Sequence, residues 1–125
     1  MAKVATGKGF ELEVPTSFVA MKEEAEKTIT RLVANHPKAQ KMWELLKNDP
    51  EVNADWDMSN YIAVAKLGYN DHGDIHMKIV AVNALKMLKI LLDNGISTSI
   101  IREKAGDEDD VYLVVLAGGL LHDIG

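Results

Sequence analysis

The sequence predicts an all-α protein, a bundle of helices preceded by a short irregular or β N-terminal arm. Apolar residues recur at three- and four-residue spacing in several segments, which is the period of an amphipathic helix. Residues 71–95 are apolar over most of a helix circumference, which is typical of a central helix. Residues 111–121 carry no charge, but a bilayer requires about 20 apolar residues, so this run predicts a buried helix.

Composition limits the classes of function. The 125 residues are 47% apolar and 26% charged, as in a globular domain, and their number predicts a single folded unit. A net charge of −5 without a Lys/Arg cluster argues against a nucleic-acid polymer as partner. The absence of cysteine excludes disulfides and thiolate metal sites and is compatible with a reducing cytoplasm. Because no signal peptide or membrane-spanning run is visible, we expect a cytoplasmic protein without a membrane partner.

The first half of the chain predicts an arm and three helices. Residues 1–15 form the arm, in which Phe10, Leu12 and Val14 alternate weakly, as in an edge strand. A first helix, capped by Thr16 or Ser17, extends to the break at residues 36–37. The second helix covers about residues 38–47, and the third runs from Asn53 or Asp57 to about residue 67.

Two further helices are predicted near the C-terminus. Ser97 and Thr98 can cap a short helix that extends to about Lys104. The acidic residues 107–110 then precede the uncharged run. Acids are favourable at a helix N-terminus, where the backbone dipole is positive. We prefer this interpretation to calcium binding, because the run lacks the alternating ligands and central glycine of a calcium loop.

The long helix has two contrasting faces on a helical wheel. A narrow polar stripe contains Lys78, Lys86, Lys89 and Asp93. His76 instead shares an apolar face with four residues, which are Val80, Asn83, Met87 and Leu91. We interpret this second face as the inward one.

Gly118 and Gly119 predict where the long helix contacts the terminal helix. Each glycine inside a helix costs about 1 kcal/mol relative to alanine, so an adjacent pair suggests the close approach of another backbone. The long helix is the natural partner, and this contact would bring His76 towards His122.

The histidines differ in their expected roles. His36 precedes a proline in a turn and is expected at the surface. His72 and His76 are four residues apart and could reach one metal ion from a common helix face. His122 and Asp123 would be costly to bury unpaired at the end of an apolar helix. Two imidazoles and one carboxylate suit a divalent cation, but a structural role is equally compatible: a core histidine, with Asp123 orienting His122 or capping a neighbour.

The motifs resemble those of the HD domain, a family of metal-dependent phosphohydrolases. The matching residues are Tyr69-Asn-Asp-His-Gly-Asp-Ile-His76 and Leu120-Leu-His-Asp-Ile-Gly125. The resemblance covers residues 69–125 and implies an HD-domain-like helical bundle, with metal ligation by His76, His122 and Asp123. It also allows His72 to be the ligand, or a catalytic group that faces the substrate. Residues 1–68 would then form the arm and a helical layer packed on this core.

One departure from the family affects the expected site. HD domains carry a further aspartate on a helix downstream of the His-Asp doublet, whereas Asp123 is followed by two residues. We therefore expect residues 69–125 to be the N-terminal part of an HD-type domain, in a bundle that is incomplete here. Apolar helix surface would then be exposed, and a homo-oligomer could cover it.

The resemblance implies hydrolysis of a phosphate ester in a phosphorylated small molecule or nucleotide. The cofactor would be a divalent ion (Zn, Mn, Fe, Co, Ni or Mg) that lowers the pKa of a bound water. Lys66 and Lys78 could meet phosphate charge but are expected to be surface lysines. The alternatives are a regulatory module that binds metal or nucleotide without turnover, and a helical interaction domain in which His76 and His122 are structural.

Overall fold

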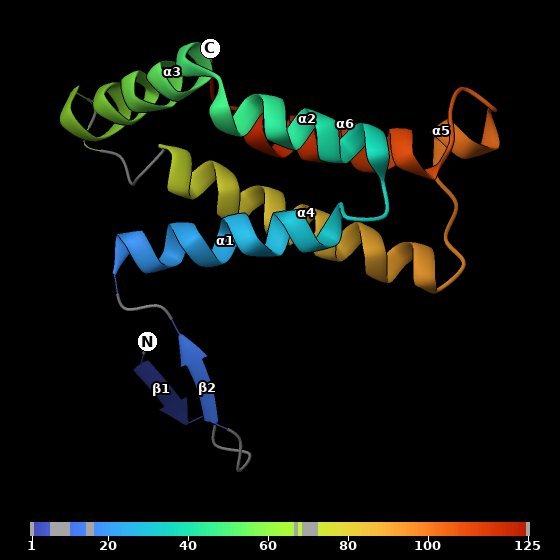
Figure 1. Cartoon of the computed structure of the whole chain (residues 1–125), viewed down its shortest axis with the longest axis horizontal. Helices are drawn as coiled ribbons and strands as arrows, with labels where there is room; N and C mark the ends of the chain where they lie inside the picture. Colours follow the sequence, from blue (N-terminus) through green and yellow to red (C-terminus); the bar gives the residue numbers. More distant parts are fainter. Residues whose placement is uncertain (1, 6–10, 15–16, 67, 69–72, 125) are drawn as a thin grey trace.

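The computed structural model describes residues 2–5, 11–14, 17–66, 68 and 73–124. Six α-helices carry the fold of this described part, which agrees with the predicted all-α class. Their bounds are α1 Phe18–Leu32, α2 Pro37–Asn48, α3 Pro50–Asn60, α4 Asp74–Asp93, α5 Ser99–Arg102 and α6 Glu108–Leu121. A π-helical segment, η1 (Tyr61–Lys66), continues α3. Two antiparallel strands, β1 (Ala2–Ala5) and β2 (Glu11–Val14), form an N-terminal arm that extends from the helices in Figure 1.

Local capping explains most helix starts. The Ser17 side chain accepts a hydrogen bond from the Ala20 amide and begins α1. Thr98 does the same for α5. Asp49 accepts hydrogen bonds from two amides at the start of α3, so this helix begins at Pro50, earlier than predicted. A proline at the first helical position has no amide hydrogen to leave unsatisfied, which suits this early start.

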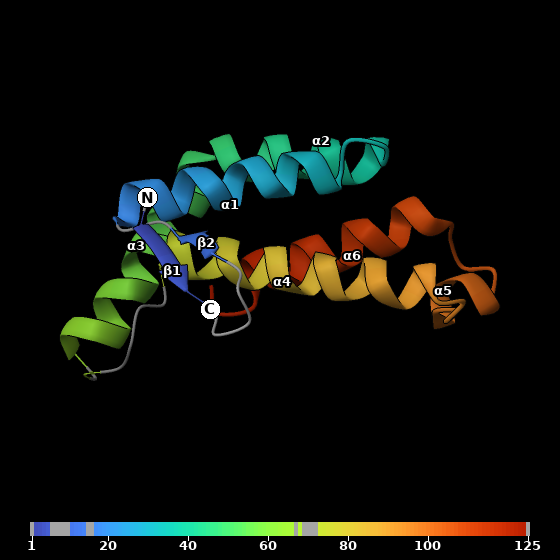
Figure 2. The ribbon, with the colours of Figure 1, turned by 90° about the horizontal axis from the view of Figure 1, so that it is seen from below.

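The main helices form two layers. Figure 2 shows α1 and α2 along one side of the pair formed by α4 and α6. Helix α4 packs on α1 and α6, and α6 packs on α2. The core between these layers is apolar and includes both tryptophans; its largest fully buried apolar side chains are Trp43, Trp56, Ile29, Met77, Leu85, Leu116, Leu120 and Val33. Burial of such side chains stabilises the bundle by about 1.5–3 kcal/mol for each large aliphatic group.

Of the two adjacent glycines in α6, Gly119 makes the predicted close contact with α4. A Cβ placed on Gly119 would lie 2.9 Å from the Ala81 Cα and 3.2 Å from the Ala81 Cβ. The backbones of α6 and α4 are therefore in close contact here, with no room for a side chain at residue 119. Gly118 was expected to share this contact, and that expectation is wrong. A Cβ on Gly118 would meet nothing within 4 Å, because this residue faces the exposed side of α6.

The inward face of α4 is not the one that the wheel suggested. Its buried side carries Met77, Ala81, Val82, Leu85 and Leu88, together with Lys78. On the face of His76, Asn83 is exposed and the Met87 and Leu91 residues are 60% and 50% exposed. Since α4 is apolar almost all round, the positions of α1 and α6 decide which side is covered. No described helix runs along the opposite side of the α4–α6 pair in Figure 2.

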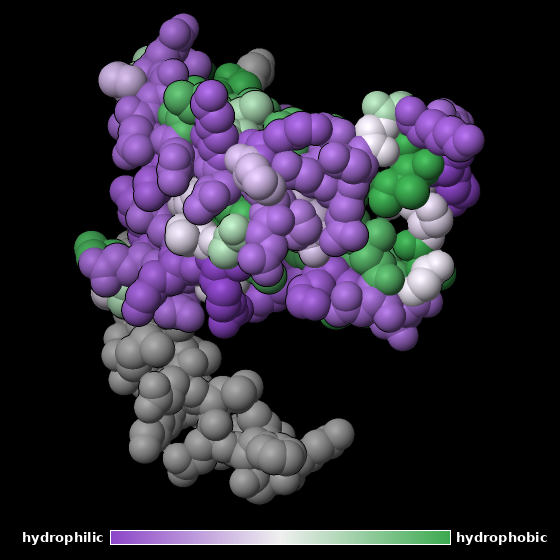
Figure 3. All heavy atoms as spheres, turned by 45° about the vertical axis from the view of Figure 1, so that its right-hand side comes forward, coloured by the Kyte–Doolittle hydropathy of each residue, from purple (hydrophilic) through white to green (hydrophobic). Residues whose placement is uncertain are grey.

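The predicted exposure of apolar helix surface is confirmed. Exposed large apolar side chains include Met87, Ile90 and Leu91 on α4 and Val114 on α6. In Figure 3 the visible face is largely hydrophilic, and apolar groups gather at the side where α5 lies. Among the described residues, no helix is both long enough and apolar enough to span a bilayer.

The acidic residues 107–110, at the start of α6, stabilise the N-terminal ends of two helices. Asp107 and Asp110 form a reciprocal capping box at the start of α6. The Asp109 carboxylate instead crosses to α2, where its two oxygens accept from the Lys38 amide at 2.8 Å and the Ala39 amide at 3.0 Å. This carboxylate supplies the cap that His36, the residue before α2, does not provide.

His36 has a structural role that the sequence did not indicate. Its ring stacks on that of Tyr112, with a centroid separation of 3.8 Å and an interplanar angle of 15°. Tyr112 is buried and His36 is half-buried, so the expected surface position of His36 is correct only in part. The stack joins the start of α2 to the first half of α6.

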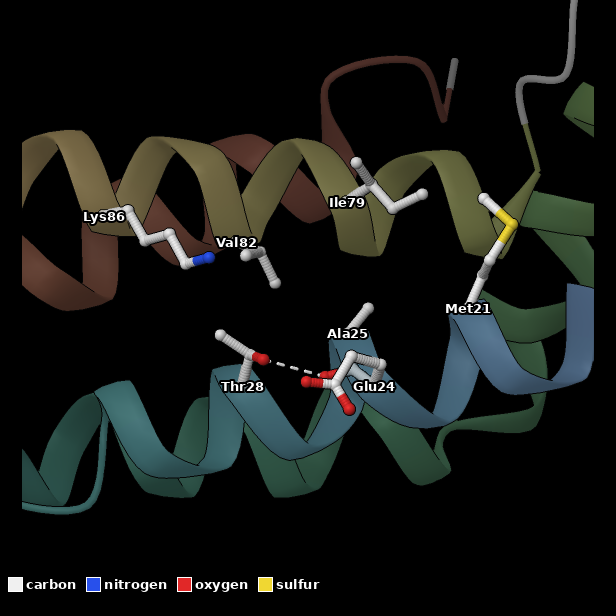
Figure 4. A pocket seen from close by; sticks show the side chains of 7 residues that line it. All are labelled: Met21, Glu24, Ala25, Thr28, Ile79, Val82 and Lys86. Carbon is white, nitrogen blue, oxygen red and sulfur yellow. Dashed lines mark hydrogen bonds between the residues drawn. The ribbon is translucent and has the colours of Figure 1, made fainter. Parts of the chain in front are cut away.

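A groove of about 350 Å³ lies between α1 and α4. Figure 4 shows its lining, which is mostly apolar with polar groups from Glu24, Thr28 and Lys86. The Thr28 hydroxyl donates to the Glu24 carbonyl at 2.8 Å and is already satisfied. None of the three predicted metal ligands lines this groove.

Candidate metal centre

The ends of two antiparallel helices bring the predicted ligands together. His76 lies in the first turn of α4, and His122 and Asp123 directly follow the last turn of α6. One donor atom from each of the three side chains lies within 4.8 Å of the other two. The His76 and His122 ring centroids are 5.7 Å apart, and the rings are tilted by 59°. The Gly119–Ala81 contact makes this convergence possible, because it draws these two helix ends together.

A backbone hydrogen bond orients the His122 ring. Its Nδ1 lies 2.9 Å from the Gly119 carbonyl oxygen, one turn earlier in α6. A carbonyl can only accept, so Nδ1 donates and a neutral ring presents the lone pair of Nε2. Histidines that bind metal commonly donate their other ring nitrogen to a carbonyl in this way. The His122 Nε2 also lies 3.4 Å from the Asp123 Oδ2. Two atoms that could each ligate a metal ion therefore lie side by side.

The cluster is open to solvent. The side chains of His122 and Asp123 are 37% and 35% exposed, and His76 is half-buried. An ion or a small molecule could therefore reach the donor atoms without a change in the fold. The partial exposure also limits the cost of holding a carboxylate and two imidazoles at this helix end.

Two side chains of α3 form hydrogen bonds with the backbone of the segment that carries the His-Asp doublet. The Trp56 indole donates to the Leu120 carbonyl at 2.8 Å, and the Ser59 hydroxyl donates to the Asp123 carbonyl at 3.0 Å. No motif in the sequence distinguishes either residue. Their three-residue spacing does place them on one helix face, but no local pattern indicates that a side chain will meet a carbonyl 64 positions away.

Lys78 is not the surface lysine that the sequence suggested. Its side chain is 1% exposed, and its Nζ lies 2.7 Å from Glu26 Oε1 and 3.5 Å from Asp74 Oδ2. A second lysine, Lys22, lies 3.1 Å from the same Asp74 oxygen. Burial favours a higher pKa for Asp74, but the hydrogen bond from Lys22 and the charges of both lysines hold its pKa below the usual value. Lys78 is thus committed to two carboxylates and is not available for phosphate.

Two further residues were predicted to take part in the site, and the structure describes one of them. His72, proposed as a catalytic group or an alternative ligand, falls outside the described residues. Lys66 is exposed, as expected, with its Nζ 5.7 Å from the Tyr61 ring centroid. Neither residue is part of the geometry described above.

Comparison with known proteins yields one informative similarity. No family model matches the chain, and no solved structure matches it. Over 82 residues, which are 66% of this chain, it is 52% identical to the uncharacterized protein MJ1020 of Methanocaldococcus jannaschii. The matched region covers 31% of that archaeal protein. The chain therefore spans about a third of the length of this relative, whose name assigns no activity.

Proposed function

We propose that this chain provides the metal centre of an HD-type, metal-dependent phosphohydrolase. The observation that carries the proposal is the convergence of His76, His122 and Asp123, whose donor atoms lie within 4.8 Å of one another. The order of the three residues, a histidine early in one helix and a doublet at the end of a later one, is also that of the HD motif. Cleavage of a phosphate ester in a phosphorylated small molecule or nucleotide follows from this resemblance and is part of the proposal.

The donor set suits a divalent cation. Two imidazole nitrogens and one carboxylate oxygen leave coordination positions for water or substrate, as in catalytic metal sites. Imidazole favours Zn, Fe, Co or Ni over Mg, and Mn is compatible with the carboxylate. The orientation of the His122 ring towards its carbonyl partner adds the outer support that such ligands usually have.

The side chains have distinct roles in the proposed reaction. A bound ion would polarise a phosphoryl oxygen and lower the pKa of a water molecule beside it. His76 and His122 would hold the ion as neutral imidazoles, and Asp123 would do so through oxygen. The half-exposed positions of His122 and Asp123 leave room for a phosphate group to approach from solvent. Lys78 takes no part in phosphate binding, because Glu26 and Asp74 already occupy its ammonium group.

Metal content tests the proposal directly. The purified chain would be loaded with cobalt or zinc, freed of excess ion and examined by elemental analysis, beside His122→Ala and His36→Ala. His36 serves as the matched control, because it is a histidine that stacks on Tyr112 outside the cluster. We expect near-stoichiometric metal in the wild type and in His36→Ala, and its loss in His122→Ala. Equal metal in all three proteins, or none in the wild type, would contradict the proposed centre.

A second candidate function is metal or nucleotide binding without turnover. The openness of the cluster favours it, since a site in which two of the three ligands are more than one third exposed excludes little water from a reacting group. Hydrolysis of bis(p-nitrophenyl) phosphate by the metal-loaded chain separates the two candidates. Turnover that disappears in His122→Ala supports the phosphohydrolase. Bound metal without turnover supports the binding module.

A further inference from the structure

We infer that Trp56 is a positioning residue, which holds the two ligand-bearing helix ends in register for metal binding. This inference rests on the proposed metal centre but concerns a residue outside it. Trp56 lies on α3, its side chain is fully buried, and it belongs to neither helix that carries a ligand. Its importance comes from the two groups that it contacts.

The first contact is with the end of α6. The last carbonyls of a helix have no partner within the helix and must find one elsewhere. Here each of the last three carbonyls accepts one hydrogen bond. The donor is the His122 ring for Gly119, the Trp56 indole for Leu120 and the Ile124 amide for Leu121. Trp56 is the member of this set that comes from a different helix. Its hydrogen bond therefore fixes the backbone next to His122 and Asp123 relative to α3.

The second contact is with the start of α4. The Lys78 Nζ lies 5.4 Å from the centroid of the Trp56 ring, within the range of a cation–π interaction. Lys78 follows His76 by two residues, and its ion pair with Glu26 fixes the position of its ammonium group. A single buried side chain thus contacts the α4 turn that carries one ligand and the α6 turn that carries the other two.

Ser59 strengthens the same attachment. It lies three residues after Trp56 on α3 and donates to the Asp123 carbonyl at 3.0 Å. These two hydrogen bonds hold the backbone on both sides of His122. Since His76 lies on α4 and the other two ligands follow α6, a shift of this segment changes the distances from the His76 donor atom to those of His122 and Asp123. Loss of such outer support typically weakens metal binding about 10–100-fold.

The test compares the same substitution at two buried tryptophans. Trp56→Phe keeps an aromatic side chain beside Lys78 but removes the indole donor to the Leu120 carbonyl. Trp43→Phe is the matched control, because Trp43 is also buried and its indole donates at 3.0 Å to the Thr30 hydroxyl, away from the cluster. Cobalt affinity would be measured by titration of the visible absorption bands. We expect Trp56→Phe to bind about 10-fold or more weakly, the size of an outer-support loss, and Trp43→Phe to bind as the wild type does.

A measurement on the metal-free chain separates this inference from the proposed function. Nuclear magnetic resonance of the histidine rings reports the Nδ1-protonated form of His122 and the proximity of His76 to His122. We expect Trp56→Phe to weaken both signals and Trp43→Phe to preserve them. If the wild type binds no cobalt, the metal centre fails as a function, but these signals still decide whether Trp56 positions the two rings.

Two outcomes would overturn the inference. Unchanged ring signals and unchanged cobalt affinity in Trp56→Phe would show that the indole donor is dispensable. An equal effect of both tryptophan substitutions would reveal a general loss of stability. If Trp56→Phe does not fold, Ser59→Ala takes its place, because it removes the donor to the Asp123 carbonyl from a half-buried position. It should then weaken cobalt affinity and the ring signals in the same direction, and an unchanged Ser59→Ala would count against the inference.

Discussion

Gly119 of α6 lies directly against Ala81 of α4, so closely that a Cβ on the glycine would be 2.9 Å from the Ala81 Cα. This contact sets the distance between the two helices whose ends carry His76 and the His122-Asp123 doublet. The atoms nearest to Gly119 include the Ala81 backbone, which cannot move out of the way of an added Cβ as the end of a flexible side chain can. The geometry of the proposed metal centre therefore depends on a residue that has no side chain.

Substitution of the two neighbouring glycines should have opposite effects on stability. Gly119→Ala forces α4 and α6 apart, and overpacking of this kind costs about 1–3 kcal/mol of the free energy of unfolding. Gly118→Ala meets nothing within 4 Å and should gain up to about 1 kcal/mol from helix propensity. Urea denaturation of both variants checks the prediction. A Gly119→Ala variant as stable as the wild type would contradict the close approach, and a destabilised Gly118→Ala would contradict the open space beside Gly118.

The carboxylate of Asp109 should stabilise a helix other than its own. Asp109→Ala removes the acceptor for two amides at the start of α2, and loss of a helix cap costs about 0.5–2 kcal/mol. Glu108→Ala is the control, since it removes an exposed acid from the same first turn of α6 and should cost less, about 0.3–1 kcal/mol from the helix dipole. The comparison uses the urea midpoints of the two variants. Equal losses would mean that the contact with α2 contributes nothing beyond the charge.

Acid should weaken the capping box at the start of α6. Two hydrogen bonds lower the pKa of Asp110 below its usual value. The larger effect comes from the Asp107 backbone amide and the smaller one from Lys38. A carboxyl group with a lowered folded pKa stabilises the protein above its unfolded pKa of about 3.9, and this stability disappears as the pH falls through the folded pKa. Asp110→Asn cannot titrate and should lose this part of the pH dependence. Chemical denaturation of both proteins between about pH 2 and pH 6 covers this window. Parallel curves for the two proteins would refute the role of Asp110.

The buried lysine should matter much more to stability than an exposed one in a similar ion pair. Lys78→Met keeps the stem but leaves Glu26 and Asp74 without their shared cation. Breaking a fully buried pair costs about 3–5 kcal/mol, and because these carboxylates retain some exposure we expect about 2–3 kcal/mol. Lys89→Met removes an exposed pair with Asp93, at 2.7 Å, and should cost little, because water screens an exposed ion pair. Thermal unfolding of the two variants measures this difference, and a similar small loss in both would show that the Lys78 network is not structural.

Local signals in the sequence determined the helical class and most of the helix ends. Ser17, Thr98 and Asp107 are capping residues whose effect extends only a few positions along the chain, so their roles could be predicted without the fold. The placement of the His-Asp doublet at the end of an apolar helix also follows from the sequence. The Gly119 contact was predicted from the adjacent glycines 118 and 119, because glycine inside a helix costs stability unless another backbone approaches closely.

Tertiary structure alone decided which groups meet across the bundle. Helix α4 is apolar almost all round, so only the positions of α1 and α6 could bury Met77 and Lys78 and leave Met87 exposed. Trp56 and Asp109 act on the ends of helices that lie 64 and about 70 positions away in sequence. These contacts depend on how the helices are arranged in space, and that arrangement follows from packing the whole core and cannot be inferred from the residues near any one position.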